Sequence, residues 1–422
     1  MTVQDLLPII SDLKDEIMSV DVTKLQNRYE ESMLDLNSQL AQVVIGVRRC
    51  GKSTMCIKRL LESGVKFGYV NFDDERLAGL QTEDLNKVLE AVYMVYGEIN
   101  YLFFDEIQNV EAWPLFVNRL LRQKLHIILT GSNAKLLSNE LMTHLTGRHN
   151  EIDLFPFSFA EYVMIKGLDT SSKSTRTTSI LSKTLLEYMH HGGLPELLSE
   201  ENTQRYVTSL TDSIINRDIA KRFKIHNITA LSNIAGYVAD NFAQEFVATK
   251  IGEKFGVSGH TAEKYYSHIK EAFLVQGIKK FSYKSHERCR NEKTYVTDMA
   301  FASTRLNTFS RENLGWRLEN VIFLELLRRA RMKMENVFYY RDKGVEVDFL
   351  LTSGHHVEEL IQVSYDMSTP RTRKREITGL LKASVKFNCN NLTIVSFNET
   401  DRVQIDDKTI DIVPASEWIL TR

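Results

Sequence analysis

The stretch "GVRRCGKST", Gly46–Thr54, has the spacing G-x-x-x-x-G-K-[ST]. Such a loop needs glycines so that backbone N–H groups can turn inward onto phosphate groups. Its lysine reaches the β- and γ-phosphates, and its hydroxyl residue holds Mg²⁺. Gly46, Gly51, Lys52 and Ser53 fill these roles. The other loop residues that we predict to surround a nucleotide are Val47, Arg48, Arg49, Cys50 and Thr54.

The surroundings of this loop agree with a phosphate-binding function. An apolar run leads into it and a helical pattern follows it, whereas a simple glycine turn before a helix would not explain Lys52-Ser53-Thr54. Further short apolar runs alternate with helical patterns, which is typical of a parallel sheet covered on both faces. We therefore predict an α/β core of the P-loop type over residues 41–165. The expected strands are 42–46, 67–72, 101–106, 126–131 and 151–155.

A second acidic signal lies at the end of the run "YLFFDE" (101–106). A buried strand that ends in Asp105 places a carboxylate at the carboxyl edge of the sheet, beside the loop, where it can hold Mg²⁺. The adjacent Glu106 can then polarise the attacking water. The alternative is a solvated acidic turn, which is less consistent with a phosphate loop in the same chain.

Three polar residues near later strands are further candidates for the chemistry. Ser132 and Asn133 follow the run "HIILTG", where a polar side chain can contact the γ-phosphate or the attacking water, or can simply cap a helix. Arg148 precedes the last expected strand and could act on the γ-phosphate of a neighbouring subunit, in a homo-oligomer, or form a surface salt bridge. Arg48 and Arg49 could contact phosphate, a neighbouring subunit or only solvent.

The composition excludes several classes of protein. With 43% hydrophobic and 26% charged residues, the 422-residue chain is typical of globular proteins with more than one domain. No apolar run reaches the roughly eighteen residues that span a bilayer, and the N-terminus does not resemble a secretory signal. We therefore expect a protein that does not contact a membrane. Its four cysteines form no C-x-x-C pair or Cys/His cluster, which indicates neither a disulfide framework nor a zinc site and favours the cytoplasm.

The second half of the chain has a different organisation. Residues 169–180 are rich in Ser and Thr and are predicted to form a loop or linker, and helical patterns fill 181–228. The pattern of residues 249–281 predicts a short helix, a turn at Gly256 and a second helix, followed by a hairpin. This is the layout of a winged helix-turn-helix, which we place over residues 229–298.

Several sequence blocks together resemble the AAA-type P-loop ATPases of bacteria and archaea, in which a winged helix and a C-terminal domain of unsettled function follow the core. The resemblance implies a five-stranded core with an extra strand between the strands that carry the phosphate loop and Asp105. It also implies ATP as the nucleotide and Glu106 as the catalytic glutamate. The blocks are "VVIGVRRCGKST", "YVNFDDERL", "YLFFDEIQNVEAWPLFVNRL", "IILTGSNAKLLS", "LTGR", "LFPFSFAEY" and "GGLPE".

The last segment, 299–422, is similar in pattern to the restriction-endonuclease-like fold. Such nucleases hold Mg²⁺ with a helix acid and strand acids, and a lysine steadies the water or the phosphate. Glu319 and Asp348 match two of the acids, but Gln362 and Ser364 stand where an acid and the lysine are expected. We therefore predict a nuclease-like fold that has lost its cleavage chemistry.

Two basic stretches, 279–293 and 371–375, favour contacts with phosphate groups, although basic loops are often only solvated. We predict an ATPase that acts as a nucleotide-driven switch or motor on a DNA or protein partner bound through the winged helix and the C-terminal half. The alternatives are a nuclease gated by ATP and a signalling scaffold that binds ATP with little turnover. Residues 1–40 are expected to form a helical lead-in.

Overall fold

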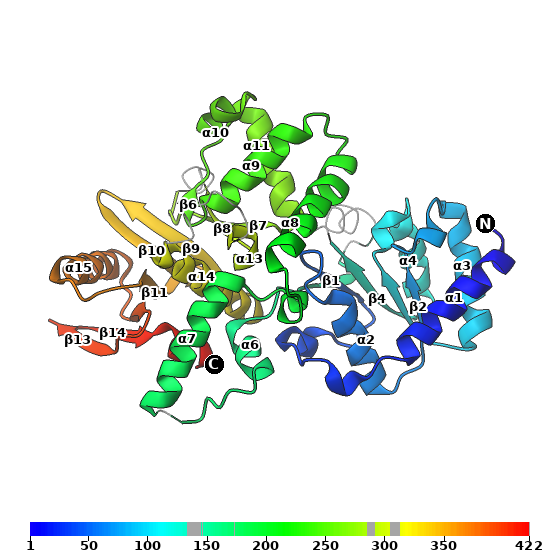
Figure 1. Cartoon of the computed structure of the whole chain (residues 1–422), viewed down its shortest axis with the longest axis horizontal. Coiled ribbons are helices and arrows are strands. Elements are labelled where there is room, and N and C mark those ends of the chain that lie inside the picture. The colour runs from blue at the N-terminus through cyan, green and yellow to red at the C-terminus, as the bar shows by residue number, and fades with distance from the viewer. Residues whose placement is uncertain (133–144, 146, 173, 285–291, 304–312, 422) are drawn as a thin grey trace. The chain divides into compact units, whose positions relative to one another are not determined.

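A computed structural model describes residues 1–132, 145, 147–172, 174–284, 292–303 and 313–421 (Figure 1). The chain divides into two compact units. The N-terminal unit consists of Met1–Pro156 and Glu271–Phe273, and the C-terminal unit consists of Phe157–Lys270 and Leu274–Arg422. The fold class is α/β in both units, with a helical region at the start of the second.

Five parallel strands form the sheet of the N-terminal unit, in the order β2-β3-β4-β1-β5. The side chains of the central strands are almost all buried, which explains why their sequences are continuous apolar runs. β4 separates β1 from β3, so the expected extra strand is confirmed. The strands are β1 Ala41–Ile45, β2 Phe67–Asn71, β3 Tyr101–Asp105, β4 His126–Gly131 and β5 His149–Asp153.

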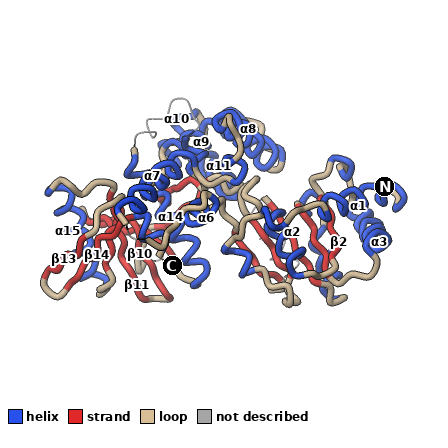
Figure 2. The backbone as a smooth tube through the Cα atoms, turned by 60° about the horizontal axis from the view of Figure 1, so that its bottom comes forward, coloured by secondary structure: helices blue, strands red, loops and turns tan. Residues whose placement is uncertain are grey.

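Helices surround this sheet, as Figure 2 shows in blue around the red strands. Helix α1 lies against α3 and β2, while α2 and α4 contact β4. The predicted lead-in of residues 1–40 therefore contributes a helix to this unit. The α-helices are α1 Val3–Met18, α2 Lys52–Ser63, α3 Leu85–Tyr96 and α4 Trp113–Arg122. Short 3-10 helices span Val22–Lys24, Tyr29–Met33, Glu75–Leu77, Thr82–Asp84 and Ile107–Asn109.

The C-terminal unit begins with helices. They are α6 Phe159–Ile165, α7 Thr175–His191, the 3-10 helix Pro195–Leu198, α8 Thr203–Ser213, the π-helix Ile214–Lys221 and α9 Ile228–Asp240. The prediction of a loop over 169–180 is wrong for 175–180, which belong to α7. Ser174 is the N-cap of this helix and its hydroxyl accepts a hydrogen bond from the Thr177 N–H, so the Ser-rich segment starts a helix.

A helix-turn-helix and a small antiparallel sheet follow. α10 (Ala248–Phe255) ends at Gly256, whose φ of 67° lies in the left-handed region that favours glycine, and α11 (Gly259–Glu271) begins shortly after it. The sheet has the order β6-β8-β7. Its strands are β6 Gln244–Glu245, β7 Val275–Lys279 and β8 Glu292–Val296, and they are followed by helix α13 Met299–Ser303.

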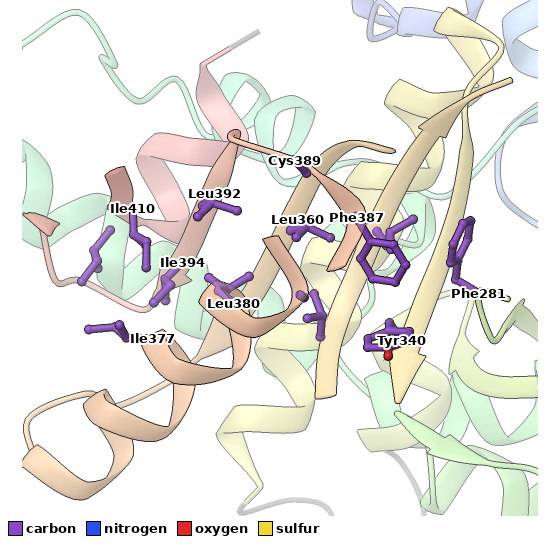
Figure 3. Close-up of a cluster of buried hydrophobic side chains, with 14 of the residues drawn as sticks. Phe281, Tyr340, Leu360, Ile377, Leu380, Phe387, Cys389, Leu392, Ile394 and Ile410 are labelled. Carbon is purple, nitrogen blue, oxygen red and sulfur yellow. The ribbon is translucent and has the colours of Figure 1, made fainter. Parts of the chain in front are cut away.

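The end of the chain forms a six-stranded mixed sheet in the order β13-β14-β12-β11-β10-β9. β10 pairs antiparallel with β9 and β11, whereas β11 pairs parallel with β12 through the crossover helix α15. Figure 3 shows the apolar core between α15 and this sheet. The elements are α14 Leu314–Lys333, β9 Asn336–Asp342, β10 Val345–Ser353, β11 His356–Ser364, α15 Pro370–Phe387, β12 Leu392–Ser396, β13 Asp401–Ile405, β14 Lys408–Pro414 and α16 Ala415–Leu420.

Across the described residues, we find no helix with both the length and the apolar character that crossing a lipid bilayer requires.

Candidate active site

The loop from Gly46 to Gly51 connects the carboxyl end of β1 to the first residue of α2, Lys52. Gly51 has a φ of 97°, in the left-handed region that favours glycine. A Cβ atom added at Gly46 would lie 2.1 Å from the backbone oxygen of Leu154, which a side chain cannot tolerate. The two glycines of the motif therefore allow the tight loop, and the N-terminus of α2 lies where it attracts an anion.

Lys52 is buried within this loop. Its Nζ donates hydrogen bonds of 3.1 Å to the backbone oxygens of Gly46 and Val47. It lies 4.0 Å from Glu106 Oε1. The structure thus places the lysine ammonium beside the Glu106 carboxylate, at the carboxyl edge of the sheet.

Asp105 ends β3 and is buried beside the loop. Its carboxylate accepts hydrogen bonds from the Tyr69 hydroxyl at 3.1 Å, from the Thr130 hydroxyl and from the Ser53 side chain. Burial raises the pKa of Asp105 and the charge of Glu106 adds to this, while the bonds from Ser53 and Thr130 act in the opposite direction. A carboxylate beside a serine hydroxyl is a donor set that suits Mg²⁺, which prefers oxygen ligands and keeps several waters.

Glu106 follows directly and is held in a defined orientation. Its backbone N–H donates to Thr130 Oγ1 at 3.2 Å, and its φ of 52° is a left-handed conformation that non-glycine residues rarely adopt. The Glu106 Oε2 atom accepts hydrogen bonds from Ser132 Oγ at 3.2 Å and from Gln108 Nε2. The carboxylate is therefore fixed between the ends of β3 and β4, where it can orient a water molecule.

Three residues that the sequence did not single out complete this arrangement. Thr130 bonds to both Asp105 and Glu106, and Gln108 orients the Glu106 carboxylate. The buried guanidinium of Arg28 donates to Cys50 O at 3.0 Å and to Phe155 O at 2.6 Å, so it fixes the loop from the N-terminal segment. Thr130 was recognisable as a hydroxyl at a strand end, but nothing local to Arg28 indicates its role.

The remaining loop residues differ in their surroundings. Val47 is buried, Thr54 is exposed, and Arg48 pairs with Asp73 across 3.4 Å. Arg49 is exposed and has a φ of 69°. Cys50 is buried, its Sγ donates to Leu154 O at 3.3 Å, and burial raises the pKa of its thiol, so its side chain serves packing.

Arg148 does not reach this site within its own chain. It immediately precedes β5, and its carbonyl accepts a hydrogen bond from Ala41 N, the first residue of β1. It therefore lies at the amino edge of the parallel sheet, opposite the phosphate loop. Its exposed side chain donates to Asn118 Oδ1 at 3.0 Å, and among the described residues it forms no salt bridge. The other uncertain candidate, Asn133, lies outside the described residues.

A separate cluster in the C-terminal unit contains the predicted nuclease-like residues. Asp348 on β10 and Gln362 on β11 are neighbours across the strands, since Asp348 N donates to Gln362 Oε1 at 3.2 Å and Val363 N donates to Asp348 Oδ2 at 2.9 Å. Glu319 on α14 is near them, because Lys293 Nζ on β8 lies 2.6 Å from Glu319 Oε1 and 3.5 Å from Asp348 Oδ1.

The position of Lys293 differs from the one that the sequence predicts. The basic stretch 279–293 includes it as a predicted phosphate contact, but it is buried and paired with these carboxylates. Ser364 does not supply the positive charge that a nuclease-like site needs; its hydroxyl donates to Asp366 O at 3.4 Å. The charge comes instead from β8, a strand of the other sheet.

Comparison with known proteins supports this description of the chain. Residues 38–163 match the family model of an AAA domain, and residues 182–312 match a domain of unknown function (DUF8612). The protein MJ1544 of Methanocaldococcus jannaschii is 35% identical over 397 residues, covering 90% of this chain and 88% of that protein. A protein of Haemophilus influenzae is 28% identical over 423 residues, covering 96% of this chain and all of that protein.

Among solved structures, the Walker-type ATPase PABY2304 of Pyrococcus abyssi is similar with a TM-score of 0.40 and 15% identity, over 67% of this chain and 96% of that one. The match to the AAA family model agrees with the phosphate loop and with the parallel five-stranded sheet. The chain belongs to the family of AAA-type P-loop ATPases that includes MJ1544.

Proposed function

We propose that this chain binds ATP with Mg²⁺ and hydrolyses it. The observation that carries the proposal is the meeting of Lys52, Glu106 and Ser132 at the carboxyl ends of three neighbouring strands. Glu106 is separated from Lys52 Nζ by 4.0 Å and is oriented by the Ser132 hydroxyl at 3.2 Å. A carboxylate in such a position can accept a proton from an attacking water.

Each residue has a role that follows from its chemistry. The backbone N–H groups of the loop and the Lys52 ammonium bind the phosphates, whose negative charge increases at the leaving oxygen. Mg²⁺, held by Ser53 and Asp105, would neutralise charge on the β- and γ-phosphates. Glu106 orients the water, while Ser132 and Gln108 keep its carboxylate in place.

We further propose that hydrolysis drives a switch or motor that acts on a macromolecule, with DNA as the leading partner. The support is the order of α10, α11 and the β6-β8-β7 sheet, which agrees with the winged helix that the sequence predicts. The fixed geometry of Glu106 favours hydrolysis over a scaffold that only binds ATP. Gln362 and Ser364 disfavour a nuclease.

The cytoplasm is the location that we propose. The buried free thiols of Cys50, Cys56 and Cys389 are consistent with it.

The Lys52→Ala variant tests nucleotide binding. Losing a charged hydrogen-bond donor to phosphate should weaken ATP binding by about 1.5–3 kcal/mol, which is roughly ten- to hundredfold. Binding of a fluorescent ATP analogue and phosphate release are measured with and without DNA, RNA or cell lysate. Lys66→Ala, which removes an exposed lysine after α2, is the matched control and should behave as wild type. Equal affinity in both variants would exclude the loop as the ATP site.

Arg148 is proposed to act on the γ-phosphate of a neighbouring subunit, since its position at the opposite sheet edge prevents contact within one chain. An Arg148→Ala protein and a Lys52→Ala protein should each be nearly inactive alone. Mixed together, they should regain part of the ATPase rate because some interfaces then contain an intact loop and an intact arginine. A mixture that stays inactive, or a chain that sediments as a monomer during turnover, would contradict the proposal.

A further inference from the structure

A cavity of about 790 Å³ in the C-terminal unit is lined by residues of β10, β11 and α15. Its floor contains the cluster of Lys293, Glu319 and Asp348, and one wall is a face of α15. This cavity is distinct from the nucleotide site, which is built entirely from the N-terminal unit.

The wall formed by α15 is basic. Arg371, Lys374 and Lys382 share one face of the helix, because intervals of three, eight and eleven residues return to nearly the same side of a 3.6-residue turn. The helix is held by its apolar side chains, among them Ile377 and Leu380, which Figure 3 shows in the buried cluster beneath the helix. The core thus orients the three cations toward the cavity.

These three cations are exposed and, among the residues that the structure describes, take part in no ion pair. The acids that line the same cavity do have basic partners. Lys293 pairs with Glu319 and Asp348, and Arg375 pairs with Glu376.

Arg341 lies 3.7 Å from Glu245 and 3.9 Å from Glu346, which completes the set of acids on the lining. The basic side chains of the lining outnumber its acids by six to five, and the three that form no ion pair among the described residues all belong to α15.

The dimensions of the basic face fit a chain of phosphates. Eleven residues separate Arg371 from Lys382, which is roughly 16 Å along a helix at 1.5 Å per residue. A nucleic acid duplex advances about 3.4 Å per nucleotide along each strand, so three cations over this length can contact separate phosphates. Thr378 and Gly379 lie between them on the same face and leave room for a sugar-phosphate backbone.

Lys293 lies between the two carboxylates of the cluster. A nuclease would place a divalent cation between Glu319 and Asp348, but the Lys293 ammonium lies 2.6 Å and 3.5 Å from their oxygens. It neutralises part of their charge and repels a second cation. The floor then neither requires Mg²⁺ nor supplies a hydrolytic water bound to metal.

We propose that the cavity and the basic face of α15 bind the phosphodiester backbone of a nucleic acid without a divalent cation and without cutting it. This inference deepens the proposed function by naming the partner of the C-terminal half, and it rests on that function only for its biological purpose. Binding itself requires no nucleotide, so it can fail or succeed independently of ATP hydrolysis.

The test compares the whole wild-type chain with an Arg371→Ala/Lys374→Ala/Lys382→Ala variant in EDTA without nucleotide. Fluorescence anisotropy measures binding to a labelled duplex DNA, a single-stranded DNA and a double-stranded RNA over a series of KCl concentrations. Loss of three phosphate contacts should flatten the slope of log K against log salt by about 2.7 for duplex DNA. The probe with the largest change in slope identifies the nucleic acid.

Arg176→Ala/Lys183→Ala/Lys333→Ala removes the same number of exposed Arg and Lys residues from other helices and is the matched control. It should leave the slope unchanged, and both triple variants should keep the basal ATPase rate. The proposal is overturned if both variants change the slope equally, if EDTA abolishes wild-type binding, or if polyglutamate binds as DNA does. Cleavage of DNA in Mg²⁺ that is lost in Asp348→Ala would also overturn it.

Discussion

Replacing Glu106 by Gln should lower the rate of ATP hydrolysis by about 10²–10⁴-fold while leaving ATP affinity close to that of the wild type. The amide keeps the size of the side chain and can still bond to Ser132 Oγ, so the local structure should be retained. It cannot accept the proton of the attacking water, because a neutral amide is a very weak base. Single-turnover hydrolysis and binding of labelled ATP measure the two quantities separately.

The matched control for this experiment is Glu111→Gln, an exposed acid a few residues further along the chain, which should hydrolyse ATP at the wild-type rate. Wild-type turnover by Glu106→Gln would assign the base to another residue. Weakened binding with an unchanged rate constant for bound ATP would mean that Glu106 supports the loop through Lys52 instead of activating water.

Replacing Lys293 by Ala should destabilise the C-terminal unit by about 3–5 kcal/mol, since removal of one partner leaves buried charges uncompensated. Lys293 is 6% exposed; burial lowers the pKa of its ammonium, but the charges of Glu319 and Asp348 outweigh burial and raise the pKa above its ordinary value. Burial already raises the pKa of Glu319, and Lys293 opposes that rise. Without Lys293, the pKa of Glu319 should therefore be higher in the native state than in the unfolded chain.

This gives the effect a definite pH dependence. Because the native variant binds more protons than its unfolded state above the ordinary pKa of glutamate, its stability should fall as the pH rises from about 5.5 to about 8. Thermal melting at the two pH values measures this change in stability. Lys166→Ala, which breaks the half-exposed pair with Glu187, should cost at most about 1 kcal/mol. Equal melting of the two variants, or a Lys293→Ala variant that is more stable at the higher pH, would contradict the expected role of Lys293.

The nucleotide-binding core could be predicted from the sequence because its determinants are local. The apolar runs that lead to Gly46, Asp105 and Ser132 define buried parallel strands, and parallel strands present their carboxyl ends at one edge. The motif supplied Lys52 and Ser53 directly. The strand boundaries predicted from the short apolar runs lie within two residues of those in the structure.

The parts that the sequence did not reveal depend on contacts between distant segments. Arg28 reaches Cys50 and Phe155 only after the N-terminal segment folds back, and no local pattern distinguishes it from a surface arginine. Lys293 stands in a basic stretch and could not be told apart from its solvated neighbours. Its partner Asp348 is 55 positions away in the sequence and meets it only in the folded chain. The helix over 175–180 was missed because hydroxyl residues favour loops as well as helix caps.

The connection between the two sheets of the C-terminal unit has a mechanical consequence. β7 runs into a segment where Phe281 N donates to Tyr339 O of β9 at 2.7 Å, and β8 carries Lys293 into the carboxylates of the larger sheet. Swinging the small sheet away from the large one would break that backbone bond and leave buried charges unpaired in a low dielectric. The small sheet and the large one should therefore move together as one rigid body, so that a rotation of the small sheet rotates the large sheet by the same angle.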